Sequence, residues 1–95
     1  MRIKYSKLIE YLKAGQGSIL SERASSITIG KRNMDGETKF RLIQTFKTLS
    51  VQYTVSSIMF GNLKLEWKFD KDMSQDLMFE KIKSDIIIKN KLIIR

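Results

Sequence analysis

The sequence predicts an α+β domain, in which a small antiparallel sheet, a meander of about four strands, is covered on one face by an N-terminal and a C-terminal helix. Apolar residues recur at helical spacing near both ends of the chain, and between these ends the spacing changes to the alternation of β-strands. The chain has 95 residues and is 42% hydrophobic, which is typical of one globular unit. We therefore assign residues 1–95 to a single domain.

The first helix is predicted near the N-terminus. Its apolar residues recur at intervals of three and four and form one stripe: Tyr5, Leu8, Ile9 and Leu12. Gly15 and Gly17 are expected to end this helix. Residues 18–24 contain serines that can cap a short helix, so the sequence indicates a short second helical turn there.

Alternating apolar and polar residues predict strands from residue 26 onward. The alternation is clearest over residues 49–55 and 63–69. Asp35 and Gly36 form a dipeptide that is typical of hairpins, and the surrounding "NMDGE" predicts a loop of about five residues rather than a two-residue turn. The second strand of this hairpin is predicted to begin near Thr38.

Residues 37–49 also fit a helix. Leu42, Ile43, Phe46 and Leu49 occupy a single helical arc, although we favour the strand. In the helical case the order of elements becomes strand, helix, strand, strand, helix, strand. That order is the split βαβ pattern of ferredoxin-like domains, here with an extra N-terminal helix.

A second helix is predicted after the sheet, with Asp72 or Ser74 as its N-terminal cap. Its inward residues are expected to be Met78, Phe79, Ile82 and Ile86. Residues 86–95 fit the end of this helix, a terminal strand or a small hairpin, and the sequence leaves these alternatives open.

The composition excludes several kinds of chemistry. The chain contains no cysteine and no histidine, which removes disulfides, sulfur-ligated metals, Ser-His or Cys-His nucleophiles and the commonest general base. We therefore expect no catalytic residues, no cofactor and no metal, and a protein that is not an enzyme. The basic N-terminal residues and the lack of a long apolar stretch predict a cytoplasmic protein with no membrane partner.

The charge balance favours a polyanionic partner. The chain has 18 lysines and arginines against 10 acidic residues, for a net charge of +8. Residues 1–47 carry ten of the basic side chains and four of the acidic ones, so the positive field belongs mainly to the first half. Such an excess on a small domain attracts polyanions such as nucleic acids.

On the strand interpretation, the basic residues gather on one uncovered face of the sheet. The candidate nucleic-acid-binding residues are Arg32, Lys39, Arg41, Lys47, Lys64 and Lys68. Threonine, serine and glutamine lie between them, with Glu66 as the single acidic residue expected there. The alternation sends the aromatic residues to the opposite, apolar face: Phe40, Phe46, Tyr53, Trp67 and Phe69.

The leading hypothesis is a non-catalytic protein that binds DNA or RNA, mainly through phosphate contacts and with weak sequence selectivity. The alternative is a protein-interaction module or inhibitor, of the phage or mobile-element type, that docks on an acidic protein partner. A second alternative is a small, basic, histidine-free endoribonuclease toxin, which the size and charge also fit. The sequence does not decide whether the ligand is DNA or RNA, or whether it is single- or double-stranded. It also leaves the oligomeric state open.

Overall fold

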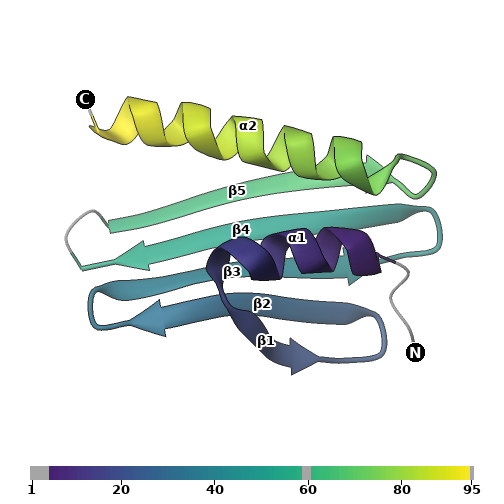
Figure 1. Ribbon diagram of the computed structural model, residues 1–95, viewed down its shortest axis with the longest axis horizontal. Helices are drawn as coiled ribbons and strands as arrows, with labels where there is room; N and C mark the ends of the chain where they lie inside the picture. The colour runs from purple at the N-terminus through teal and green to yellow at the C-terminus, as the bar shows by residue number, and fades with distance from the viewer. Residues whose placement is uncertain (1–4, 59–60, 95) are drawn as a thin grey trace.

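The chain folds as a meander sheet with a helix at each end of the sequence. A computed structural model describes residues 5–58 and 61–94 (Figure 1). The elements are α1 (Ser6–Gln16), β1 (Ser18–Glu22), β2 (Ser26–Asn33), β3 (Gly36–Gln44), β4 (Thr48–Ser57), β5 (Gly61–Asp70) and α2 (Gln75–Ile94). The strands form one sheet in the order β1-β2-β3-β4-β5, and each neighbouring pair is antiparallel. The predicted fold class is confirmed, with five strands in place of about four.

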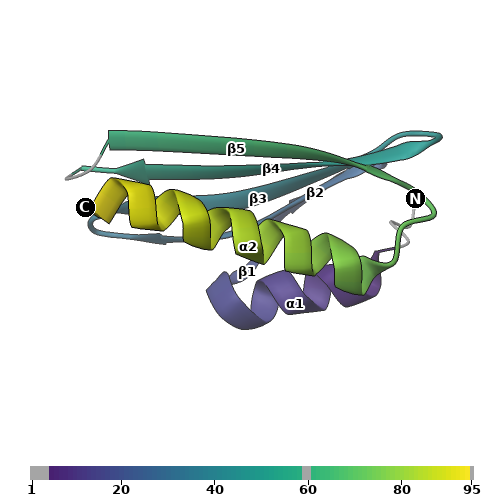
Figure 2. The same ribbon diagram turned by 90° about the horizontal axis from the view of Figure 1, so that it is seen from above.

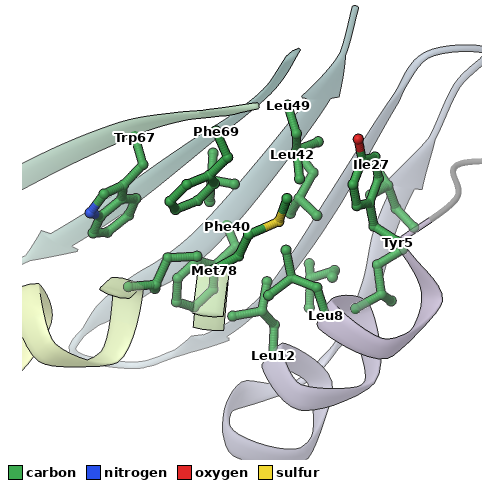
Figure 3. Close-up of a cluster of buried hydrophobic side chains, with 14 of the residues drawn as sticks. Tyr5, Leu8, Leu12, Ile27, Phe40, Leu42, Leu49, Trp67, Phe69 and Met78 are labelled. Carbon is green, nitrogen blue, oxygen red and sulfur yellow. The ribbon is translucent and has the colours of Figure 1, made fainter. Parts of the chain in front are cut away.

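Both helices lie on the same face of the sheet, and the other face is left uncovered (Figure 2). Between sheet and helices is a core of buried side chains, part of which Figure 3 shows. The core consists of Tyr5, Leu8, Ile9, Leu12, Ile27, Ile29, Phe40, Leu42, Leu49, Val51, Tyr53, Trp67, Phe69, Met78 and Ile82. Burial of these apolar side chains is the main force that holds the helices on one face.

Residues 37–49 do not form a helix. β3 spans Gly36–Gln44 and pairs with β2 on one side and with β4 on the other. The strand interpretation is confirmed and the split βαβ alternative is wrong, because the two-sided backbone pairing outweighs the helical spacing of the apolar residues. At the other end of the chain, α2 runs as one helix to Ile94, which settles the open question for residues 86–94.

Residues 18–22 form a strand where the sequence indicated a helical turn over residues 18–24. β1 pairs with β2 from Ser18 to Glu22, although all five of its residues are exposed. The serines that can cap a short helix are a weak local signal. The unpaired edge of β2 offers a row of backbone donors and acceptors, and pairing with that edge decides the structure.

The hairpin between β2 and β3 is tighter than predicted. Asn33 pairs with Gly36, so the turn contains two residues, Met34 and Asp35, and the expected five-residue loop is wrong. Gly36 makes this possible because its φ of +154° is a conformation that favours glycine. A Cβ at this position would also collide with the backbone carbonyl oxygen of Ser56 on β4.

β3 ends two residues before Phe46, which overturns the prediction that this ring is buried. Phe46 lies in the turn between β3 and β4, and 84% of it is exposed. The turn is held by Thr45, whose backbone N–H donates to the Thr48 carbonyl oxygen at 2.9 Å and whose Oγ1 accepts from the Thr48 N–H at 3.1 Å. These bonds form a turn directly after Gln44, so the strand and its alternation of side chains end at that residue.

Polar contacts join the second helix to the first helix and to the sheet. The carboxylate of Asp76 accepts hydrogen bonds from Tyr11 Oη at 2.6 Å and from Lys7 Nζ at 3.1 Å. The indole Nε1 of Trp67 donates to Asp85 Oδ2 at 2.7 Å. These bonds to the charged form lower the pKa of both carboxyl groups, with Tyr11 as the largest cause for Asp76 and Trp67 as the largest cause for Asp85.

Candidate nucleic-acid interface

The candidate site is the uncovered face of the sheet, which we call the open face. Antiparallel partners point to the same side, so the strand register lines up its side chains in rows. One row runs from Lys39 through Thr54 to Lys64, and the next runs from Arg41 through Gln52 to Glu66. The hydroxyl of Thr54 therefore lies between two cations, whereas the amide of Gln52 lies between a cation and a carboxylate.

The predicted cations are mostly brought together, with one exception. Arg32, Lys39 and Arg41 lie on the open face of β2 and β3, and Lys64 and Lys68 lie on the open face of β5. Lys47 lies in the turn after β3, at the end of the sheet, and is exposed there. The prediction that Lys47 shares the sheet face is wrong, for the same reason as for Phe46.

A carboxylate that the sequence analysis missed lies among these cations. Glu37 Oε2 accepts from Arg32 Nε at 2.8 Å and lies 2.6 Å from the guanidinium Nη2, while its Oε1 lies 2.7 Å from Lys39 Nζ. The side chain of Glu37 is only 19% exposed, whereas that of Arg32 is 79% exposed. Hydrogen bonds from Lys39, the larger cause, and from Arg32 lower the pKa of Glu37. This carboxylate therefore stays ionised and neutralises part of the positive charge of the site.

Three cations on the open face are left without a carboxylate partner. Arg41, Lys64 and Lys68 are exposed, and none of them forms an ion pair with another residue of the described part of the chain. The second carboxylate on this face, Glu66, accepts a hydrogen bond from Gln52 Nε2 at 2.8 Å instead. These three side chains can therefore contact a ligand without breaking an existing ion pair.

The open face is hollowed where these residues meet. The hollow has a volume of about 880 Å³ and crosses the sheet from the β1–β2 connection to β5. It is lined by four cations and one carboxylate: Arg23, Lys39, Arg41, Lys64 and Glu37. The remaining lining is mainly hydroxyl and amide side chains, which can donate hydrogen bonds to phosphate oxygens.

A second hollow of about 880 Å³ lies at the end of the sheet, beside the start of α2. Its lining combines the exposed ring of Phe46 with one cation, Lys71, and one carboxylate, Asp72. Lys71 Nζ already lies 5.5 Å from the centre of the Phe46 ring. This end of the molecule lacks the excess positive charge of the open face, and it is the weaker candidate.

Among residues 5–58 and 61–94, aromatic side chains take no part in the open face. Phe40, Tyr53, Trp67 and Phe69 are buried on the opposite side of the sheet, as the alternation predicted. Within the described residues, no aromatic ring lines the open-face hollow. As far as the structure describes the chain, the site therefore offers charge and hydrogen bonds but no aromatic ring on which a base could stack.

The ionised carboxylates predict how stability depends on pH. The pKa values of Glu37, Asp76 and Asp85 are lowered in the folded protein. Their contribution to the free energy of unfolding is therefore complete above the pKa of the unfolded chain, about 4, and is lost as the pH falls through the pKa of the folded protein. The chain has no histidine to titrate between pH 5 and 8. Urea unfolding should give a constant free energy from pH 5 to 8 and a decrease below about pH 4.5. A free energy that stays constant down to pH 2.5 would contradict this assignment.

Comparisons with known proteins add no relative to this picture. No family model, no curated protein and no solved structure matches the chain. Among residues 5–58 and 61–94, no helix is long and apolar enough to cross a membrane, and no three acidic side chains gather as they would around a metal ion. The functional argument therefore depends on the geometry and charge of the open face.

Proposed function

We propose that this protein binds nucleic acid in the cytoplasm, without catalysis, through the open face of its sheet. The observation that supports the proposal most strongly is a set of three cations, Arg41, Lys64 and Lys68, that form no ion pair with another described residue. They lie beside the hydroxyl and amide groups of β4. Lysine and arginine neutralise phosphates and release counterions, while short polar side chains hold the backbone in place. Contacts to bases play a minor part in this mechanism, so sequence selectivity is weak.

The proposal is tested by fluorescence anisotropy with labelled oligonucleotides at several salt concentrations. We expect micromolar or tighter binding at low salt, with a log–log salt slope that corresponds to about four to seven phosphate contacts. An RNA probe recovered at full length would agree with a non-catalytic role. An absence of binding at low salt to every probe would contradict the proposal and redirect the search to an acidic protein partner.

Glu37→Gln is expected to strengthen binding. The substitution removes the charge that holds Arg32 and Lys39, and it frees both cations for phosphate contacts. We expect affinity to rise about five- to tenfold at low salt and the salt slope to steepen by about one contact. Titration of the variant beside the wild type measures both quantities.

Glu80→Gln is the matched control for Glu37→Gln. It makes the same change in net charge, but Glu80 lies on α2 and pairs with Lys83 at 3.4 Å, away from the open face. We expect less than a twofold change in affinity for this variant, because exposed ion pairs contribute little and no ligand contact is altered. Equal gains from the two variants would show that net charge, and not the position of Glu37, sets the affinity.

A further inference from the structure

The open face differs from the usual surface that binds single-stranded nucleic acid, and the inference from this difference rests on the proposed function. Proteins that bind single strands without sequence preference usually combine a cationic groove with aromatic rings on which the bases stack. Here Phe40, Tyr53, Trp67 and Phe69 are all in the core, with exposed fractions of 9% or less. Over the described residues, the main source of affinity for unpaired bases is therefore missing from the face that carries the charge.

The two described rings nearest to solvent do not change this picture. Phe46 lies in a turn at the end of the sheet and lines a different hollow from that of the open face. Tyr11 packs on Phe79 with 4.9 Å between the ring centres, and its hydroxyl donates to Asp76. Neither ring is placed to receive a base from a strand that lies across β3, β4 and β5.

A duplex requires only what the open face provides. Its bases already stack on one another, and its two backbones present about one negative charge per 1.7 Å, against about one per 3.4 Å for a single strand. The free cations are also spread over the sheet, since Lys64 and Lys68 are four residues apart on β5, which is about 13 Å along the strand. Cations at this separation can contact the two backbones that border one groove.

We propose that the open face recognises the paired phosphate backbones of a double-stranded nucleic acid in preference to a single strand. The uncharged groups beside the cations support this choice. Thr54 lies between Lys39 and Lys64, and Gln52 lies between Arg41 and Glu66. These side chains reach phosphate or sugar oxygens but have no flat surface to hold a splayed base. DNA and RNA duplexes share this chemistry, and the test separates them.

The inference is tested with four probes of one sequence: duplex DNA, duplex RNA and the corresponding single strands, each titrated at the same salt concentration. We expect at least one duplex to bind at least about ten times more tightly than its own single strand. The difference in affinity between the two duplexes then shows whether the DNA or the RNA helix is preferred. Single strands that bind as tightly as both duplexes would overturn the inference and leave the proposed function standing. Loss of binding to all four probes would overturn the proposed function itself.

A gain-of-function variant tests the physical reason. Thr54→Tyr places one ring on the exposed open face between Lys39 and Lys64, at a strand position that accepts aromatic residues well. We expect single-strand affinity to rise about tenfold, whereas duplex affinity should not rise. Thr54→Val, which removes the hydroxyl contact without adding a ring, should raise neither affinity. An unchanged single-strand affinity in Thr54→Tyr, with the fold intact by circular dichroism, would contradict the stacking argument.

Discussion

Replacement of Lys39, Arg41, Lys64 and Lys68 together by glutamine is expected to weaken nucleic-acid binding by about 100-fold or more at low salt. Lys39, Arg41 and Lys64 are three of the four cations that line the open-face hollow, and Lys68 lies on the same face of β5. Arg41, Lys64 and Lys68 have no ion pair to another described residue. The salt slope should fall by about three to four contacts, because each lost contact retains one counterion on the nucleic acid. Anisotropy titration of the variant measures both changes.

A second fourfold variant controls for net charge. Lys7, Lys13, Lys81 and Lys83 lie on α1 and α2, and all four form exposed ion pairs there. Their replacement by glutamine removes the same total charge from the covered side of the sheet. We expect affinity to fall by less than about fivefold, through the long-range field alone. Similar losses in the two fourfold variants would show that binding does not depend on the open face.

Leu42→Ala is expected to have the largest effect on stability. Leu42 is on β3, has no exposed surface and lies in the cluster between the sheet and the helices (Figure 3). Truncation of such a side chain removes its buried area and leaves a cavity, which costs about 2–5 kcal/mol of unfolding free energy. For a domain of this size, the melting temperature should fall on the order of 10–30 °C.

Leu20→Ala is the matched control for Leu42→Ala. It deletes the same atoms at a position on β1 where 49% of the residue remains exposed. We expect less than about 1 kcal/mol of destabilisation, because much of that surface is in contact with water before the change. Equal destabilisation by the two variants, measured by urea unfolding, would contradict the position of Leu42 at the centre of the core.

The alternation of apolar and polar residues predicted most of the fold. It separated the buried face of β4 and β5 from the open face, because a strand that is covered on one side has a side-chain period of two. It also predicted correctly that Trp67 and Phe69 point to the core. The apolar stripe of α1 was equally informative. Leu8 and Leu12 belong to that stripe, and both are buried because this side of the helix packs on the core.

The sequence failed where hydrogen bonds, and not the spacing of apolar residues, decide the structure. Phe46 continues the alternation of β3 in the sequence, but the hydrogen bonds between Thr45 and Thr48 end the strand before it. Residues 18–24 have only weak local signals, and the free edge of β2 recruits them as a strand. The spacing of apolar residues indicates neither the turn at Thr45 nor the pairing of β1 with β2.

Glu37, the carboxylate of the candidate site that the sequence analysis missed, has a similar explanation. Glu37 and Lys39 are two residues apart, so a strand that begins at Gly36 places them on the same face. The predicted five-residue loop hid this relation, because it moved the start of the strand to Thr38. The two-residue turn also sets Arg32 opposite Glu37, and a prediction of that turn would have revealed the ion pair.

The most direct test of the central claim is a map of the contact surface by nuclear magnetic resonance. An unlabelled oligonucleotide duplex is added at low salt to the protein labelled with nitrogen-15, and shifts of backbone and arginine side-chain signals are followed. The account predicts that the largest shifts fall on residues 37–41, 50–54 and 62–68 and on the side chain of Arg41, with little change in α1 and α2. Largest shifts on the helices, or none on the open face, would contradict it.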